Sequence, residues 1–175
     1  MSLRQLQQPD LVQDVAGAVD AAGLAPADLV LELTESVLVL DNEATIQRLH
    51  ELRALGVHLA VDDFGTGYSS LAYLRRLPVD ALKLAGAFVE GLTAGAEQAA
   101  LAQAIMWLAD TLGLQVVAEE VEEADQLRAL QALGCRYGQG YLFARPLDQF
   151  AVDALLDAEQ RRHAQRPAAA PTASR

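Results

Sequence analysis

The chain has 175 residues, a formal net charge of −11 and a hydrophobic content of 52%. These values indicate one globular domain and exclude a disordered chain. The acidic charge argues against a surface that coats nucleic acid, since phosphate backbones need a basic face, whereas metal ions can still bring a small nucleotide to an acidic pocket.

The single cysteine, Cys135, excludes an intramolecular disulfide, and we expect it only to pack. No run of about 18 apolar residues predicts a membrane span. The N-terminus lacks the apolar centre of a signal peptide. We therefore expect a cytoplasmic protein.

In chain order, amphipathic segments alternate with short apolar runs. Helices are expected over 9–22, 42–55 with Asp41 as a cap, 69–77, 97–112, 122–133 and 147–159. Strands are expected over 29–33, 57–61, 81–84, 114–118 and 137–143. Three glycines follow expected helices and suit left-handed caps, namely Gly56, Gly113 and Gly134. The repeated strand–helix order predicts the α/β class with a parallel sheet over residues 1–160, followed by a disordered tail over 161–175.

Polar residues lie at or near the carboxyl end of each expected strand. They are Glu32, Glu35, Asp62, Asp63, Lys83, Glu119 and Gln139. Because the carboxyl ends of parallel strands share one face, these side chains are expected to gather at a ligand site. The alternative is that each strand turns polar as it reaches water.

Several carboxylates at one rim require a counter-charge. Carboxylate and amide oxygens suit Mg²⁺ or Mn²⁺, and two such ions with a positioned water form a site that hydrolyses phosphodiesters. The three histidines do not form a zinc-binding group, since His50 and His58 flank a helix end and His163 lies in the tail. Lys83 either positions or deprotonates a water, or serves only as an ion-pair partner.

A glycine-containing segment, "FGTGYSS", follows the two aspartates. Its residues are Phe64, Gly65, Thr66, Gly67, Tyr68, Ser69 and Ser70. The two glycines allow left-handed backbone, and either serine can cap the next helix. The segment is either an ordinary loop or a mobile loop that shapes the site.

Five segments carry a resemblance to a known family: "LELTES", "VDDFGTGYSSL", "LKL…FV", "VVAEEVE" and "GQGYLFARPL". They resemble the EAL-domain phosphodiesterases of bacteria, which hydrolyse cyclic di-GMP to pGpG. The resemblance runs from Ser2 to about Leu147. It implies a (β/α)₈ TIM-like barrel, of which this chain would contain the last five βα units as a partial barrel.

The resemblance also implies roles for single residues. Glu32, Asp62, Asp63 and Glu119 resemble metal ligands, Lys83 the residue that positions the attacking water, Gln139 the glutamine near that water, and Glu35 the glutamate that holds the glycine-rich loop. Further implied partners are cyclic di-GMP, a second copy of the chain through that loop, and an upstream regulatory or cyclase domain or partner chain. No DNA partner is expected.

The chain departs from the family pattern at the site. The Glu-Ala-Leu strand is not in the sequence, and a metal-binding Asn would fall one residue before Met1, so the two-metal site is expected to be incomplete. Ala85 replaces a usual Asp, and Glu120 replaces a usual Gly. Three hypotheses stay open: a phosphodiesterase with impaired catalysis, a non-catalytic module that binds cyclic di-GMP or a protein, and an inactive truncated product.

Overall fold

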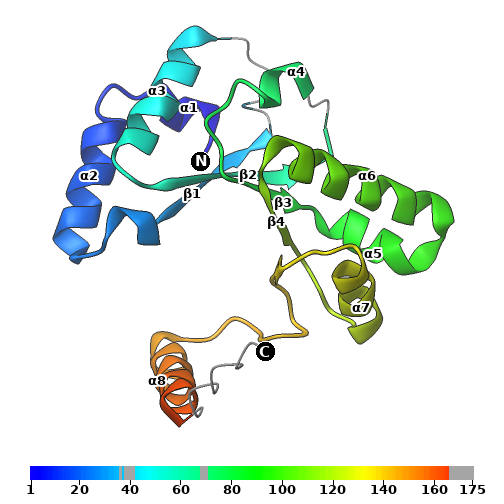
Figure 1. Cartoon of the computed structure of the whole chain (residues 1–175). Helices are drawn as coiled ribbons and strands as arrows, with labels where there is room; N and C mark the ends of the chain where they lie inside the picture. Colours follow the sequence, from blue (N-terminus) through cyan, green and yellow to red (C-terminus); the bar gives the residue numbers. More distant parts are fainter. Residues whose placement is uncertain (36, 38–41, 68–70, 166–175) are drawn as a thin grey trace, which may run out of the picture. The chain divides into compact units, whose positions relative to one another are not determined.

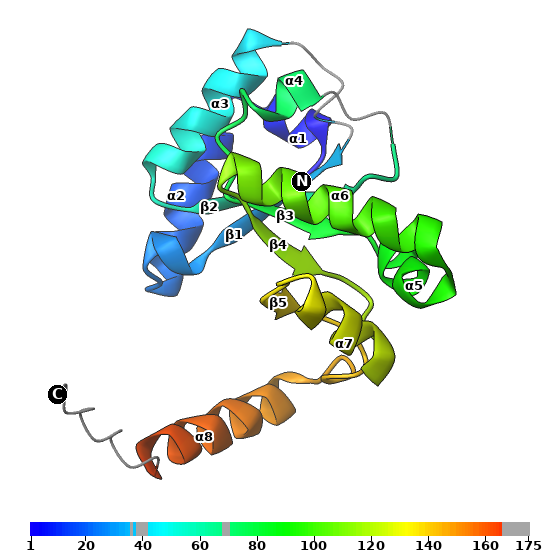
Figure 2. The same cartoon turned by 45° about the vertical axis from the view of Figure 1, so that its right-hand side comes forward.

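Five parallel strands organise the fold in the computed structural model, which describes residues 1–35, 37, 42–67 and 71–165. The strands are β1 (Val30–Thr34), β2 (His58–Phe64), β3 (Ala81–Leu84), β4 (Gln115–Ala118) and β5 (Tyr137–Gly138). They pair in sequence order in one sheet, with β1 and β5 outermost (Figure 1 for β1 to β4, Figure 2 for β5). Sheet and helices confirm the expected α/β class, and the sheet is open.

Helices connect the strands of this sheet. In the unit Met1–Phe143 they are α1 (Leu3–Leu6), α2 (Leu11–Ala22), α3 (Glu43–Ala54), α4 (Leu71–Leu74), α5 (Gly86–Ala94), α6 (Ala96–Leu112) and α7 (Ala124–Ala132), with a 3₁₀ turn over Pro26–Asp28. Helix α6 packs against β3 and β4, and α5 packs against α6 and α7 (Figure 2). None of the helices in the described part of the chain has the length and apolarity to cross a lipid bilayer.

The core lies between the sheet and these helices. Side chains alternate between the two faces of a strand, and the helix-facing positions are apolar. Leu59, Leu82 and Leu84 are each 0% exposed there. Burying one such side chain stabilises the fold by about 1.5–3 kcal/mol. The other face of the sheet is open and carries the polar side chains of the site, together with exposed apolar residues such as Val30 and Tyr137.

The helix and strand bounds differ from the sequence prediction in several places. Strand β2 extends through both aspartates to Phe64, and β5 contains only two of the seven residues expected over 137–143. Asn42 caps α3 by accepting a hydrogen bond of 2.9 Å from the Ala44 amide, whereas the expected cap, Asp41, lies outside the described residues. Helix α5 was not predicted. Gly56, Gly113 and Gly134 all have positive φ, as expected for left-handed caps.

The second unit begins at Ala144 and contains α8 (Gln149–Gln165). The Asp148 side chain accepts a hydrogen bond from the Ala151 amide at 2.9 Å, which satisfies one amide of the first helical turn. The helix continues to Gln165, into the segment 161–175 for which the sequence predicts disorder, and that disorder stays a prediction.

Candidate active site

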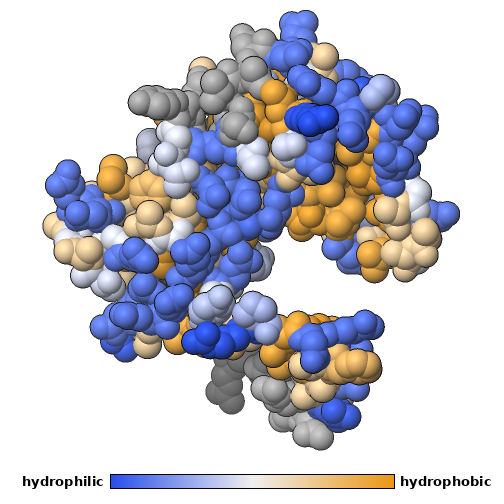
Figure 3. Space-filling model, turned by 180° about the vertical axis from the view of Figure 1, so that it is seen from behind, coloured by the Kyte–Doolittle hydropathy of each residue, from blue (hydrophilic) through white to orange (hydrophobic). Residues whose placement is uncertain are grey.

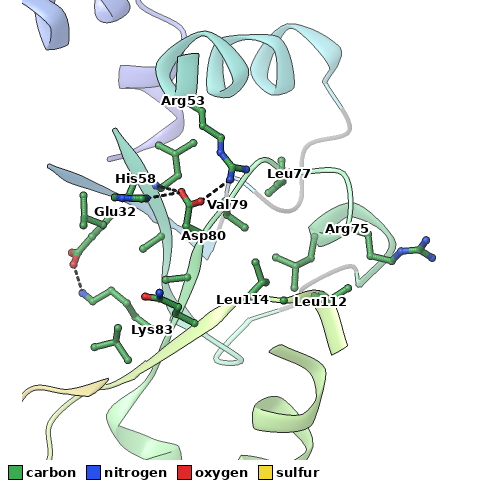
Figure 4. A pocket seen from close by; sticks show the side chains of 18 of the residues that line it. Glu32, Arg53, His58, Arg75, Leu77, Val79, Asp80, Lys83, Leu112 and Leu114 are labelled. Carbon is green, nitrogen blue, oxygen red and sulfur yellow. Dashed lines mark hydrogen bonds and ion pairs between the residues drawn. The ribbon is translucent and has the colours of Figure 1, made fainter. Parts of the chain in front are cut away.

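Lys83 is the centre of a cluster of carboxylates at the carboxyl end of the sheet. Its Nζ lies 2.7 Å from Asp62 Oδ1, 2.8 Å from Glu32 Oε1 and 2.8 Å from Glu119 Oε1. Figure 4 shows the Glu32–Lys83 pair. Lys83 lies on β3, Glu32 on β1 and Asp62 on β2, while Glu119 follows β4. We call these four residues the Lys83 cluster. Lys83 is also the only lysine in the sequence.

Strand register explains why these side chains meet. Glu32 pairs with Ala60, two residues before Asp62, so both carboxylates lie on the open face of the sheet. Lys83 pairs with Val117, two residues before Glu119, and this brings the second half of the cluster to the same face. The alternation of side chains along four neighbouring strands therefore builds the cluster.

A bulge in β2 accommodates the two adjacent aspartates. Val61 pairs with Leu82 and Phe64 with Leu84, so that Asp62 and Asp63 together lie opposite Lys83. Asp63 has a φ of 55°, in the left-handed region that side-chain-bearing residues rarely adopt. An inserted residue of this kind re-aims its neighbours, which lets Asp62 point at Lys83.

Lys83 is a protonated donor in this environment. It is 6% exposed, and burial acts to lower its pKa, but hydrogen bonds to Asp62, Glu119 and Glu32 outweigh burial and raise the pKa above the usual lysine value. The ammonium group therefore stays charged at neutral pH. This favours a role in positioning a water over one in deprotonating it.

Glu119 links Lys83 to the end of the sheet. Burial raises the pKa of Glu119, and the bond to Lys83 opposes this effect. Its Oε1 also accepts a hydrogen bond of 2.8 Å from Gln139 Nε2. Gln139 follows β5 and donates its backbone amide to Ala118. Five of the expected residues therefore lie together, namely Glu32, Asp62, Lys83, Glu119 and Gln139.

Glu35 holds the start of the glycine-rich loop. Its Oε2 accepts hydrogen bonds from the Gly67 amide at 2.9 Å and from Thr66 Oγ1 at 3.4 Å, and Glu35 is 8% exposed. A Cβ at Gly67 would lie 3.2 Å from the Glu35 carboxylate, so another residue there would push the carboxylate away by a few tenths of an ångström. Tyr68, Ser69 and Ser70 lie outside the described residues.

A cavity of about 730 Å³ runs along the open face of the sheet. Glu32, Lys83 and Gln139 line one part of it. The Asp80 carboxylate, also in its lining, contacts Arg53 at 2.8 Å and His58 at 3.5 Å (Figure 4). The Asp80 network was not predicted from sequence, because nothing in the spacing of these residues shows that they meet. His58 is half-exposed, as expected for a surface histidine.

The surface of the protein mixes polar and apolar areas. Figure 3 shows one face of the protein, on which hydrophobic patches interrupt a largely hydrophilic surface. Exposed large apolar side chains of the first unit include Trp107, which is 70% exposed on α6. Isolated exposed apolar residues are normal on protein surfaces and do not by themselves mark a binding site.

The pattern of motifs that surrounds this geometry is that of a known family. The EAL domain family matches residues 1–146. The chain belongs to the EAL domain family. The resemblance seen in the sequence is thereby confirmed over most of the chain.

Named relatives of this EAL domain act in cyclic di-GMP turnover. The cyclic di-GMP phosphodiesterase NbdA of Pseudomonas aeruginosa is 49% identical over 153 residues, which cover 87% of this chain and 20% of NbdA. The solved PaMucR phosphodiesterase in complex with c-di-GMP has a TM-score of 0.80 and 41% identity, covering 86% of this chain and 62% of that one. The chain thus spans about a fifth of NbdA's length.

A metal-bound relative gives a further comparison for this EAL domain. Klebsiella pneumoniae BlrP1, solved with manganese and cyclic di-GMP, has a TM-score of 0.74 and 34% identity, covering 81% of this chain and 36% of that one. Here no group of three His, Cys, Asp or Glu residues is arranged as a metal site within the described ranges. The Lys83 ammonium nevertheless has three carboxylate oxygens within 2.8 Å. Oxygen donors around one cation fit Mg²⁺, Mn²⁺ or Ca²⁺ in their chemistry.

Proposed function

We propose that the EAL domain hydrolyses cyclic di-GMP to pGpG with the aid of divalent cations. The observation that supports this most is the convergence of Glu32, Asp62 and Glu119 on Lys83 at the carboxyl end of a parallel sheet. The names of NbdA and of the PaMucR complex point to the same substrate. This chain matches only part of the length of each relative. The activity of the whole protein is therefore a proposal.

The proposed mechanism assigns a task to each side chain. Glu32, Asp62, Asp63 and Glu119 would hold Mg²⁺ or Mn²⁺, which supply charge stabilisation and lower the pKa of a bound water when present. The Lys83 ammonium would donate hydrogen bonds that orient a water and offset negative charge on the phosphate when its carboxylate partners hold the ions. Gln139 fixes Glu119 through its 2.8 Å hydrogen bond. Glu35 keeps the loop that starts at Phe64 in place.

The test is incubation of the 175-residue chain with cyclic di-GMP and Mn²⁺, followed by chromatography of the products. We expect pGpG to accumulate with the wild-type chain and not with Glu32→Ala. Glu51→Ala is a matched control, since this half-exposed glutamate lies on α3, outside the Lys83 cluster. If wild-type turnover does not exceed that of Glu32→Ala, the proposal is wrong.

A second candidate is a non-catalytic module that binds cyclic di-GMP. Ala85 and Glu120 favour it, because both lie at the carboxyl ends of the strands that carry Lys83 and Glu119. Calorimetry with cyclic di-GMP and Ca²⁺ separates the two functions. Heat of binding without hydrolysis in Mn²⁺ would support the module, and hydrolysis would exclude it.

The setting of the reaction is also part of the proposal. The single cysteine suits the reducing cytoplasm. We also propose that the domain extends to about residue 160, that a second copy binds near the glycine-rich loop, and that a regulatory or cyclase domain or partner chain lies upstream.

A further inference from the structure

Glu120 has an unusual conformation directly beside the Lys83 cluster. It follows Glu119 in the chain and has a φ of 54°, in the left-handed region. Asp63, which follows Asp62, has nearly the same φ. Because a side chain in this conformation is unfavourable, a contact that holds Glu120 there is expected.

The side chain of Glu120 lies against the first residue of α5. A Cβ built on Gly86 would be 2.3 Å from Glu120 Oε2 and 2.9 Å from Glu120 Cβ. A side chain at position 86 would have to displace the Glu120 side chain, so Gly86 leaves the space that Glu120 occupies. The two positions are 34 residues apart in the chain.

The amino end of α5 has no capping side chain of its own. Its N-cap residue is Ala85, which makes no side-chain hydrogen bond to the helix. The first amides of a helix carry partial positive charge and favour a nearby carboxylate. The Glu120 carboxylate lies beside Gly86, the first residue of α5, and Ala85 provides no side-chain acceptor there.

The start of α5 is closely connected to Lys83. Only Leu84 and Ala85 separate Lys83 from Gly86, and the Leu84 carbonyl accepts a hydrogen bond of 3.0 Å from the Glu119 amide. A carboxylate that fixes this turn therefore also fixes the strand end from which Lys83 reaches Glu119.

We propose that Glu120 is a positioning residue: its carboxylate stabilises the amino end of α5 in place of a capping side chain at Ala85, and through this turn holds Lys83 against Glu119. Glu120 contacts Gly86 and acts on the site through Lys83, so it is not a catalytic residue. The role of Glu120 in catalysis rests on the proposed hydrolysis. The contact between Glu120 and Gly86 does not depend on that proposal.

Hydrogen exchange measures the first part of the proposal. In Glu120→Gln, which keeps the size of the side chain and removes its charge, amides over residues 84–90 are expected to exchange about two- to fivefold faster. Ala85→Ser supplies a small uncharged cap, since Ala85 is only 3% exposed. This serine is expected to restore slow exchange in Glu120→Gln and to change little in the wild type.

The second part is read from the Lys83 ammonium signal in an ¹⁵N NMR spectrum, which is unambiguous because Lys83 is the only lysine. We expect the signal to shift or broaden in Glu120→Gln and to recover with Ala85→Ser. Glu122→Gln removes an exposed charge nearby and should alter neither readout.

Three results would overturn the inference. Unchanged exchange over residues 84–90 in Glu120→Gln, or an equal effect of Ala85→Ser in both backgrounds, would show that Glu120 does not act at this helix end. Faster exchange with an unaltered Lys83 signal would show that it does not position Lys83. Neither measurement needs metal or cyclic di-GMP, so failure of the proposed hydrolysis is a separate result.

Discussion

Lys83 fills, as a single residue, the position that a cation would take among three carboxylates. Glu32 is half-exposed, whereas Glu119 is largely buried, so part of the charge repulsion among the carboxylates is screened by water and part is not. The ammonium group offsets the part that water does not screen. Charge balance at the site therefore depends on one side chain.

Replacing Lys83 by Met tests this dependence. We expect the free energy of unfolding to fall by about 2 kcal/mol in metal-free buffer, because the buried Glu119 carboxylate loses its charged partner and keeps only Gln139. Mn²⁺ is expected to recover part of the loss by taking the place of the ammonium group. Urea denaturation with and without Mn²⁺ measures both effects.

Arg53→Met is the matched control for this substitution. It breaks a half-exposed ion pair with Asp80 and is expected to cost about 1 kcal/mol or less. Mn²⁺ should not reverse that loss. An equal response of both variants to Mn²⁺ would contradict a cation site at the Lys83 cluster.

The raised pKa of Lys83 predicts that the free energy of unfolding depends on pH. A group whose pKa is raised on folding stabilises the fold fully below its unfolded pKa, which is about 10.4 for lysine. Above that pH the unfolded chain releases the proton while the folded chain keeps it, so this stabilisation is lost. The difference in unfolding free energy between wild type and Lys83→Met should be constant from pH 8 to 10 and should decrease above. A difference that grows above pH 10 would contradict the assignment.

At the scale of elements, the loop after β2 is fixed to β1 through Glu35. A carboxylate that accepts the Gly67 amide and lies close to the Gly67 Cα ties two segments that are 32 residues apart. Hydrogen bonds to a charged acceptor are stronger than neutral ones. The conformation of Thr66 and Gly67 should therefore depend on their contacts with Glu35.

Glu35→Ala is expected to raise the exchange rate of the Gly67 amide about tenfold and to lower the unfolding free energy by about 1–2 kcal/mol. Glu35→Gln retains an oxygen acceptor and should recover part of both losses. Amide exchange followed by NMR measures the first effect and urea denaturation the second. If the Gly67 amide exchanges at the wild-type rate in Glu35→Ala, the loop is held by other contacts.

The elements also show what sequence patterns can and cannot predict. The mostly apolar run over 81–84 predicts both ends of β3 correctly. Helix α5 was missed because Gly86 and Gly91 lower its helix propensity. Packing against α6 stabilises α5 instead. A Cβ at Gly91 would lie 2.8 Å from Gln98, so the two helices approach closely there.

The ends of β2 and β5 differ from prediction for reasons of pairing. Two adjacent aspartates are expected to end a strand, yet β2 continues to Phe64 because β1 and β3 pair with it on both sides and a bulge absorbs the extra residue. Strand β5 is short because Gly140 turns the chain beside Val121, so close that a Cβ would contact the Val121 backbone.

At the scale of the whole first unit, the sheet has two outer strands. The Met1 carbonyl accepts a hydrogen bond of 3.1 Å from the Thr34 amide, which covers one end of β1. Val30, at the other end, is 50% exposed. Outer strands with exposed apolar residues favour pairing with another chain.

We therefore expect the 175-residue chain to associate in a concentration-dependent manner, and Val30→Lys to weaken this association because a charge on an outer strand opposes pairing. Sedimentation velocity over a range of concentrations measures the effect. Leu24→Lys replaces an equally exposed leucine that lies before β1 and is the control. A monodisperse monomer at all concentrations would contradict the expectation.

The composition of the site could be predicted from sequence, but its arrangement could not. The position of Glu32, Asp62, Lys83 and Glu119 at strand ends is visible in the alternation of polar and apolar residues. The three carboxylates contact one ammonium group because of the strand register and the bulge at Asp62 and Asp63. Neither the register nor the bulge is visible in the pattern of polar and apolar residues. The fit of Glu120 to Gly86 is likewise visible only in three dimensions.

The burial of the only lysine has a practical consequence for chemical labelling of this protein. With Lys83 6% exposed, the surface offers no lysine side chain to amine-directed cross-linkers, dyes or acetylating reagents. Cross-linking through lysines would therefore under-report any complex that the chain forms, whereas the 24 aspartates and glutamates suit carboxyl-directed reagents. An amine-reactive probe that begins to label Lys83 would instead report that the carboxylate cluster has opened.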